Sequence, residues 1–242
     1  MIDSMKQDMK NIYKRFGKII KLILILMLFY YINYSVYIVM MLFNISKADL
    51  NGASLVLLNA FTDILLMFIL FIIYRKDLIK DWDKFRANPI DNFDAGIKYW
   101  FVGLLGMIAS NVLINILFTT GGAGNEKAVQ SMISNLPWMM LIDAGIIGPF
   151  IEEIVFRKTF KDACRNKWLF VIISSLVFGA LHVTSNIVHW YDALYIIPYS
   201  CLGLAFALSY KETDTIFTSM FMHMIHNSVL ILSSIFLLGL II

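Results

Sequence analysis

The chain has 242 residues, of which 60% are hydrophobic and 15% are charged, whereas an ordinary soluble domain is roughly half apolar and a quarter charged. So much apolar surface excludes a soluble protein with one core of this size and favours a membrane protein. The formal net charge of +3 is too small to indicate nucleic-acid binding, and Cys164 and Cys201 predict neither a disulfide framework nor a metal knuckle.

The apolar runs of the chain predict its transmembrane helices. A helix needs about 20 mostly apolar residues to cross a bilayer, and seven runs are long enough: 22–43, 55–74, 99–119, 138–157, 168–186, 191–209 and 216–240. The last run contains a polar step, His226-Asn227-Ser228, and an eighth span results if the run divides there. We therefore predict an all-α, polytopic membrane protein with seven or eight transmembrane helices and a buried polar site.

Lysine and arginine residues are concentrated in alternate segments between these runs. Residues 1–21, 75–98, 157–167 and 210–215 hold 18 of the 20 basic residues. Because cytoplasmic loops carry the excess of Lys and Arg, this asymmetry predicts a cytoplasmic N-terminus. The abundance of Ile, Lys and Asn favours a bacterial cell membrane as the location.

Two polar segments between the runs have helical features. In 75–98, Leu78, Trp82 and Phe85 fall at helical spacing, which predicts either a short helix lying on the inner membrane surface or a solvated loop. Segment 124–137 predicts a similar piece on the outer side.

Ionisable residues occur inside the predicted spans, where lipid does not tolerate them without a partner, and such residues indicate function. They are Asp63, Asp143, Glu152, Glu153, Arg157, His182, His223 and His226. Each also has a structural interpretation. A glutamate–arginine pair can simply link helices, a single histidine can be a hydrogen-bonded interior residue, and the two aspartates can serve helix packing or line a polar cavity.

The stretch GPFIEEIVFRKTF, residues 148–160, places two adjacent carboxylates at the end of an apolar run. On a helix, Glu153 and Arg157 are four residues apart and can pair, whereas Glu152 points about 100° away and lacks that partner. Pro149 cannot donate a hydrogen bond to the carbonyl of Gly145. The glycines of this run, Gly145 and Gly148, would allow another backbone to come close.

Two further spans present polar groups at a four-residue spacing. Phe178 and His182 are four apart in FGALH, and His223 and Asn227 are four apart in HMIHN, with His226 near the same face. A carboxylate, two imidazoles and a carboxamide are suited to activating water and stabilising an oxyanion. Three of these residues, Glu152, His182 and His223, could instead hold a zinc ion with a water as its fourth ligand.

The three motifs E-E-x-x-x-R, F-x-x-x-H and H-x-x-x-N, in this order, resemble the CAAX-protease and bacteriocin-processing family of intramembrane endopeptidases, over roughly residues 135–235. The resemblance implies that Glu152 activates a water with help from His182, and that His223 and Asn227 bind the oxyanion. It implies a supporting role for Glu153 and Arg157. This family is described both as metalloproteases and as metal-free glutamate proteases, so zinc stays open.

The predicted spans and the resemblance together predict an organisation and a function. Residues 1–134 are expected to form an N-terminal transmembrane region of three spans with the polar segment 75–98, and the resemblance implies that residues 135–242 form the catalytic membrane core. The expected partners are the lipid bilayer and a peptide or membrane-protein substrate, such as a pheromone, bacteriocin or leader peptide. The alternative is a non-catalytic member that acts as a scaffold, regulates a sensor or confers bacteriocin immunity. A proton-coupled transporter is disfavoured because no inverted repeat is visible.

Overall fold

The computed structural model describes residues 2–32, 34–46, 50–118, 123–184 and 187–239, and all regular secondary structure in these ranges is helical. The prediction of an all-α protein is therefore confirmed. The elements are α1 (Ile2–Ile32), α2 (Ser35–Leu42), α3 (Gly52–Ala87), α4 (Pro89–Phe118), α5 (Gly124–Asn135), α6 (Pro137–Ile142), η2 (Asp143–Ile147), α7 (Gly148–Glu152), η3 (Glu153–Lys158), α8 (Thr159–Ala163), α9 (Lys167–Thr184), η4 (Trp190–Tyr195), α10 (Ile196–Thr213) and α11 (Ile216–Leu237).

Five helices in the described residues are long and apolar enough to cross a membrane, or six if α1 and α2, which are bent by 44° at their junction, form one broken span. The count of seven or eight is not confirmed. Residues 138–157 account for the difference between six and seven, because this run is divided among α6, η2, α7 and η3 and no single element reaches the required length. The polar step at 226–228 does not divide the last run, since α11 continues to Leu237.

The outer faces of the bundle expose large apolar side chains. On α3 and α4, Phe61, Phe68 and Ile116 are each more than half exposed. Contiguous apolar surface of this kind is rare on soluble monomers and marks a membrane or protein contact. Together with the length and hydropathy of the helices, this surface supports an integral membrane protein.

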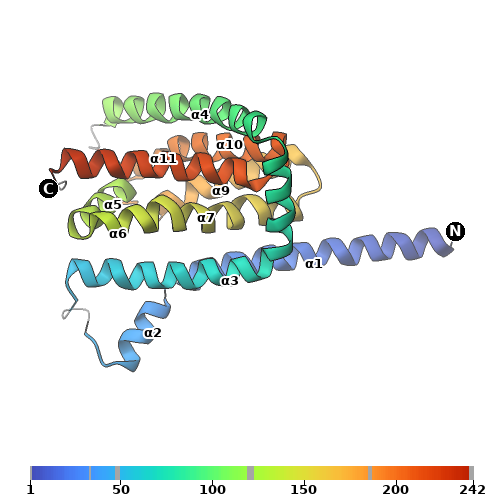
Figure 1. Ribbon diagram of the computed structural model, residues 1–242, viewed down its shortest axis with the longest axis horizontal. Coiled ribbons are helices and arrows are strands. Elements are labelled where there is room, and N and C mark those ends of the chain that lie inside the picture. Colours follow the sequence, from blue (N-terminus) through green and yellow to red (C-terminus); the bar gives the residue numbers. More distant parts are fainter. Residues whose placement is uncertain (1, 33, 47–49, 119–122, 185–186, 240–242) are drawn as a thin grey trace.

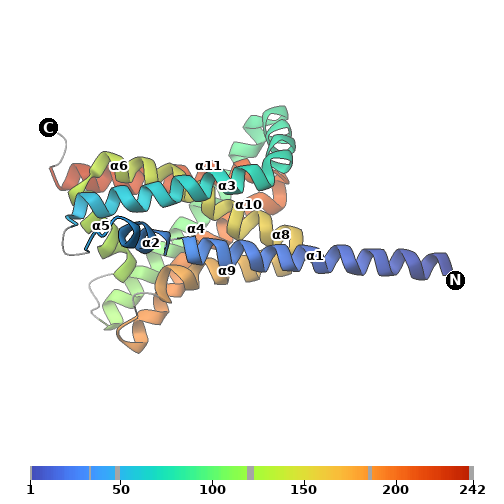
Figure 2. The same cartoon turned by 90° about the horizontal axis from the view of Figure 1, so that it is seen from below.

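The helices form a bundle around the run from α6 to α8, whose middle part is buried on all sides (Figures 1 and 2). The side chains of Ile154, Val155 and Phe156 in η3 are essentially inaccessible and belong to the main core cluster with residues of α1, α3, α9 and α10. A helix in such a central position is expected to be apolar around most of its surface, and Glu153 and Arg157 are buried charged exceptions in this turn. The site motif therefore lies on the most enclosed element of the fold.

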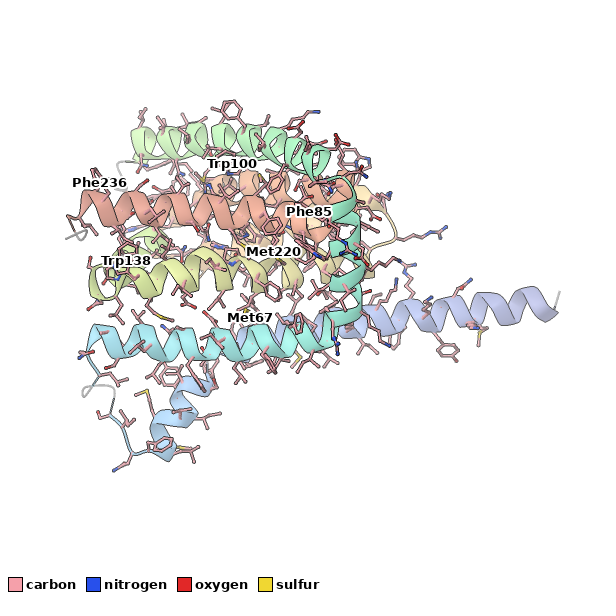
Figure 3. The ribbon with its side chains drawn as sticks, viewed as in Figure 1. Met67, Phe85, Trp100, Trp138, Met220 and Phe236 are labelled. Carbon is pink, nitrogen blue, oxygen red and sulfur yellow. The ribbon has the colours of Figure 1, made fainter. Side chains whose placement is uncertain are left out.

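The basic segments gather at one end of the bundle. In Figure 1 the N-terminal part of α1, the α3–α4 junction and the α10–α11 junction all lie at the right-hand end, and Figure 2 places α8 there too. Near this end α3 bends, and its last turns, which hold the labelled Phe85, run across the ends of the neighbouring helices (Figure 3). The solvated-loop interpretation of 75–98 is therefore wrong. The segment is helical, but it consists of the end of α3 and the start of α4 and is not a separate short helix. At the opposite end, residues 124–135 form the helix α5.

Glycines allow α9 and α10 to approach closely, as small residues do in membrane helix pairs. A Cβ added at Gly179 would lie 2.7 Å from the carbonyl oxygen of Ile196 and 2.2 Å from the hydroxyl of Ser200. The first of these contacts is with backbone and cannot be relieved by a side-chain rotation.

We expect Gly179→Ala to lower the thermal stability of the purified protein and to disturb its neighbour His182, because α9 must move away from α10. The matched control is Gly17→Ala, since a Cβ added at Gly17 meets nothing within 4 Å and alanine has the better helix propensity. Thermal unfolding in detergent checks both variants. Equal melting temperatures would contradict the close α9–α10 packing.

Candidate active site

The central run is not a regular α-helix, and its irregularity begins before Pro149. The N–H of Gly148 donates to the carbonyl of Asp143, five residues back, which makes η2 a π-helical turn. Pro149 has no N–H to offer to the carbonyls of the preceding turn. Single π turns of this kind are frequent at functional sites.

Helix α11 supplies the missing donors. The side-chain amide of Asn227 donates to the carbonyl of Ala144 (2.9 Å) and the hydroxyl of Ser228 donates to that of Gly145 (3.4 Å). The Gly145 carbonyl, to which Pro149 cannot donate, therefore accepts a hydrogen bond from another helix. The predicted close approach of another helix is found at Gly145, where an added Cβ would lie 3.0 Å from the Ser228 hydroxyl oxygen. It is not found at Gly148, where an added Cβ would meet only the carbonyl oxygen of Asp143 in the same run.

A second π turn, η3, begins at Glu153. In this turn the carbonyl of Ile154 accepts two hydrogen bonds from Thr159, one from the backbone N–H and one from the side-chain hydroxyl at 2.8 Å. The same hydroxyl is 2.8 Å from the phenol oxygen of Tyr74 on α3. Glu152 is thus the last residue of a short α-helical piece that lies between two widened turns.

Glu153 and Arg157 form the predicted ion pair, with 3.6 Å between the Arg157 Nε and the Glu153 Oε2, and both side chains are fully buried. The Arg157 guanidinium lies 4.6 Å from the centre of the Phe178 ring. A buried pair that is broken on one side leaves a charge without compensation, so these residues are expected to contribute strongly to stability.

The imidazole of His223 lies between the two adjacent glutamates. Its Nδ1 is 3.0 Å from Glu153 Oε1, and its Nε2 is 3.6 Å from Glu152 Oε2. The ring stacks on Phe206, with 4.6 Å between the ring centres. The side chains of neighbouring residues on a helix point about 100° apart. Glu153 can therefore face Nδ1 of the His223 ring while Glu152 faces Nε2 of the same ring.

His182 approaches Glu152 from α9. Its Nδ1 is 2.9 Å from the carbonyl oxygen of Phe178, one turn back, and its Nε2 is 3.9 Å from Glu152 Oε2. Because a carbonyl only accepts, Nδ1 must carry the proton, and in the neutral ring Nε2 presents a lone pair. Tyr199 of α10 stacks on the ring, with 4.9 Å between the ring centres, and fixes its plane.

Exposure divides the site into two layers. The side chains of Glu152 and His182 are 21% and 20% exposed, whereas those of Glu153 and Arg157 are fully buried. The first pair is therefore the part of the cluster nearest to the surface, although the Glu152 Oε2 atom itself is buried. The second pair is enclosed and contacts His223 through Glu153.

Some of the candidate residues lie elsewhere. His226, expected near the face of His223, turns away and accepts a hydrogen bond from the Trp100 indole of α4 at 3.3 Å; Figure 3 labels Trp100. The carboxylate of Asp143 is buried with one oxygen unpartnered. Asn227 lies one turn from His223 and uses one amide hydrogen on Ala144, so its second hydrogen is available.

Sequence reasoning missed the two aromatic residues that hold the imidazoles, Tyr199 and Phe206. Both stand on α10, whose motif-free sequence gives no signal for them. Among the described residues, no group of three His, Cys, Asp or Glu side chains is placed to hold a metal ion. Zinc binding by Glu152, His182 and His223 stays a prediction.

The fold and the site define a polytopic membrane protein with a glutamate–histidine cluster enclosed by its helices. Residues 134–229 match the family described as "Type II CAAX prenyl endopeptidase Rce1-like", so this part of the chain is similar to that family. All six predicted site residues lie within the matched segment. The resemblance inferred from the three motifs is thus confirmed.

Similar proteins occur in several bacteria. The chain is 27% identical over 155 residues to the "Putative membrane peptidase YdiL" of Bacillus subtilis, in an alignment that covers 61% of this chain and 60% of the relative. It is 24% identical over 170 residues to the "UPF0177 protein YxdF" of Lactococcus lactis, covering 66% and 86% of the two chains. No solved structure matches the chain.

Proposed function

We propose that the protein is an intramembrane endopeptidase in which Glu152 activates the attacking water. One observation carries the proposal. The Glu152 Oε2 atom has no hydrogen-bond partner, yet it faces the Nε2 atoms of His223 and His182 at 3.6 and 3.9 Å. These separations are too long for direct hydrogen bonds and suit a water that bridges the three groups.

The proton transfers follow from the acid–base character of these groups. As the water oxygen attacks the peptide carbonyl carbon, Glu152 accepts a water proton, and it returns this proton to the nitrogen when the C–N bond breaks. The lone pair on His182 Nε2 accepts a hydrogen bond from the second O–H of the water, which orients the water without removing this hydrogen. No other co-reactant is needed for hydrolysis.

His223 and Asn227 are the proposed donors to the oxyanion. With Nδ1 bound to Glu153, a proton on Nε2 makes His223 an imidazolium that the buried carboxylate stabilises, and this ring can donate to a negative oxygen. Arg157 in turn compensates the Glu153 charge. The free amide hydrogen of Asn227 is the second donor.

The substrate is proposed to be a peptide or a membrane-anchored segment. The family and the Bacillus subtilis relative are both named as peptidases, and processing of a pheromone, bacteriocin or leader peptide fits a bacterial membrane. Zinc stays an untested prediction and no step above uses it. Measurement of the metal content, with and without a chelator during the assay, decides whether zinc is required.

The test of the function is cleavage in water enriched in ¹⁸O. Purified wild-type protein in detergent is incubated with a mixture of synthetic hydrophobic peptides of known sequence, and mass spectrometry detects new C-termini. We expect ¹⁸O in the new carboxylates only where active protein is present, because the attacking oxygen comes from water. If wild-type protein yields no more labelled termini than a boiled sample, the endopeptidase proposal fails and the non-catalytic alternative is favoured.

We also propose that the run from α6 to α8 crosses the membrane as a seventh span, with the N-terminus in the cytoplasm. The basic segments then all lie on the inner side, as the excess of Lys and Arg requires. In a chain with Cys164 and Cys201 replaced by serine, we expect a cysteine at position 126 to react with an impermeant maleimide outside intact cells. Cysteines at positions 80 and 165 should react only after lysis. Labelling of position 165 from outside would exclude the seventh span.

A further inference from the structure

Two cavities lie along α1 and are not used by the proposed chemistry. Figure 2 shows α1 running beside α8 and α9. The first cavity, of about 740 Å³, lies at the basic end of the bundle and is lined by Asn11, Ile12, Lys14, Arg15, Lys18, Lys161, Asp162, Ala163, Cys164 and Arg165. The second, of about 490 Å³, is apolar and is lined by Ile23, Leu26, Met27, Phe29, Tyr30, Tyr31, Val177, Ala180, Leu181 and Thr184.

The first cavity has a large excess of positive charge. One of its lysines is neutralised, because Lys161 Nζ is 2.7 Å from a carboxylate oxygen of Asp214. Burial would raise the pKa of Asp214, but hydrogen bonds from Lys161 and Lys84 outweigh it and lower the pKa to about 2, so this partner stays ionised. The one acidic residue of the lining, Asp162, is paired with Lys158 at 3.2 Å.

Four cations of the lining remain uncompensated. In the described part of the chain no ion pair engages Lys14, Arg15, Lys18 or Arg165, and all four are exposed. They come from two elements far apart in the sequence and surround one cavity. Such a cluster concentrates positive potential and attracts an anion.

The spacing of the two cavities along α1 identifies the kind of anion. From Lys18 in the first cavity to Ile23 in the second, the helix rises by about 7.5 Å. The headgroup layer on one side of a bilayer is about 5–7 Å thick. A molecule with a negative group at headgroup level and apolar chains directly below it would fill both cavities.

We propose that an anionic phospholipid of the leaflet at the basic end binds along α1, with its phosphate among the four cations and an acyl chain in the apolar cavity. The bound lipid would fasten α1 to α8 and α9. This proposal does not rest on the peptidase function, since neither cavity includes a residue of the glutamate–histidine cluster. If lipid binding is not found, the endopeptidase proposal still stands, and if peptide cleavage is not found, the lipid-binding proposal still stands.

The test is lipid titration of the purified full-length chain, followed by native mass spectrometry. The probes are phosphatidylglycerol, which is anionic, and phosphatidylcholine, which is neutral. The variant Lys14→Gln/Arg15→Gln/Lys18→Gln removes three of the four cations. Its matched control, Arg75→Gln/Lys76→Gln/Lys80→Gln, removes three exposed cations from the same end that line neither cavity.

We expect wild-type protein to bind phosphatidylglycerol more tightly than phosphatidylcholine. The variant Lys14→Gln/Arg15→Gln/Lys18→Gln should bind phosphatidylglycerol about tenfold or more weakly than wild type, because several basic side chains then no longer attract the anionic headgroup. The control should stay within about twofold of wild type on the same principle. An equal loss in both variants, or no preference in the wild type, overturns the proposal. Displacement of the lipid by excess glycerol 3-phosphate or inorganic phosphate would show a site for free phosphate instead, which also overturns it.

Discussion

Glu152→Gln is expected to lower the rate of peptide-bond cleavage by about a hundredfold or more, the loss typical of removing a general base. The change keeps the size and hydrogen-bonding capacity of the side chain and removes only its ability to accept a proton. Because Glu152 is partly exposed and has no ion pair shorter than 3.6 Å, the protein level and melting temperature should stay close to those of wild type.

The matched control is Glu126→Gln, which changes an exposed glutamate on α5. The intramembrane histidines give a second, parallel comparison. His182→Gln and His223→Gln should lower the rate strongly, whereas His226→Gln, on the same helix as His223 but bonded to Trp100, should retain most of it. A well-expressed Glu152→Gln variant that cleaves at the wild-type rate would refute the assignment of the base.

Glu153→Gln is expected to destabilise the protein as well as to inactivate it. The change leaves the Arg157 guanidinium buried without its counter-charge, which should cost about 3–5 kcal/mol of unfolding free energy. It also removes the carboxylate that holds His223. Expression level, melting temperature and cleavage rate are measured together, and all three should fall.

The double-mutant cycle makes this prediction specific. Arg157→Gln should destabilise the protein to a similar degree, and the double variant should be milder than the sum of the two, because neither charge is then left alone. Additive losses would argue against a direct pair. A Glu153→Gln variant that is fully folded yet inert would move the base from Glu152 to Glu153.

The local part of the site could be predicted from the sequence, because spacing on one helix determines which side chains share a face. The Glu153–Arg157 pair follows from a separation of four residues. Pro149 likewise predicts a carbonyl without its helical donor. The three motifs predicted the family because their order along the chain is visible without any structure.

The contacts between helices could not be predicted in this way. The start of each helix relative to its neighbours decides whether His182 and His223 reach Glu152, and the spacing of residues within one helix does not give that start. The stacking of Tyr199 and Phe206 on the two imidazoles depends on the position of α10. The division of 138–157 by π turns depends on hydrogen bonds from α11, which no local pattern contains.

The π turn at 143–147 has a consequence for insertions and deletions in this gene. A π turn holds one residue more than an α turn, and because the wider turn takes up this residue, the helix after it keeps its rotational direction. Ile146 lies in this turn and is about half exposed, so many side chains should be acceptable there. Removing the codon altogether should regularise the helix and still leave both glutamates facing His223, because the deleted residue is the one that the wider turn takes up. The variant would lose the π turn itself, in which the Ala144 carbonyl accepts from Asn227.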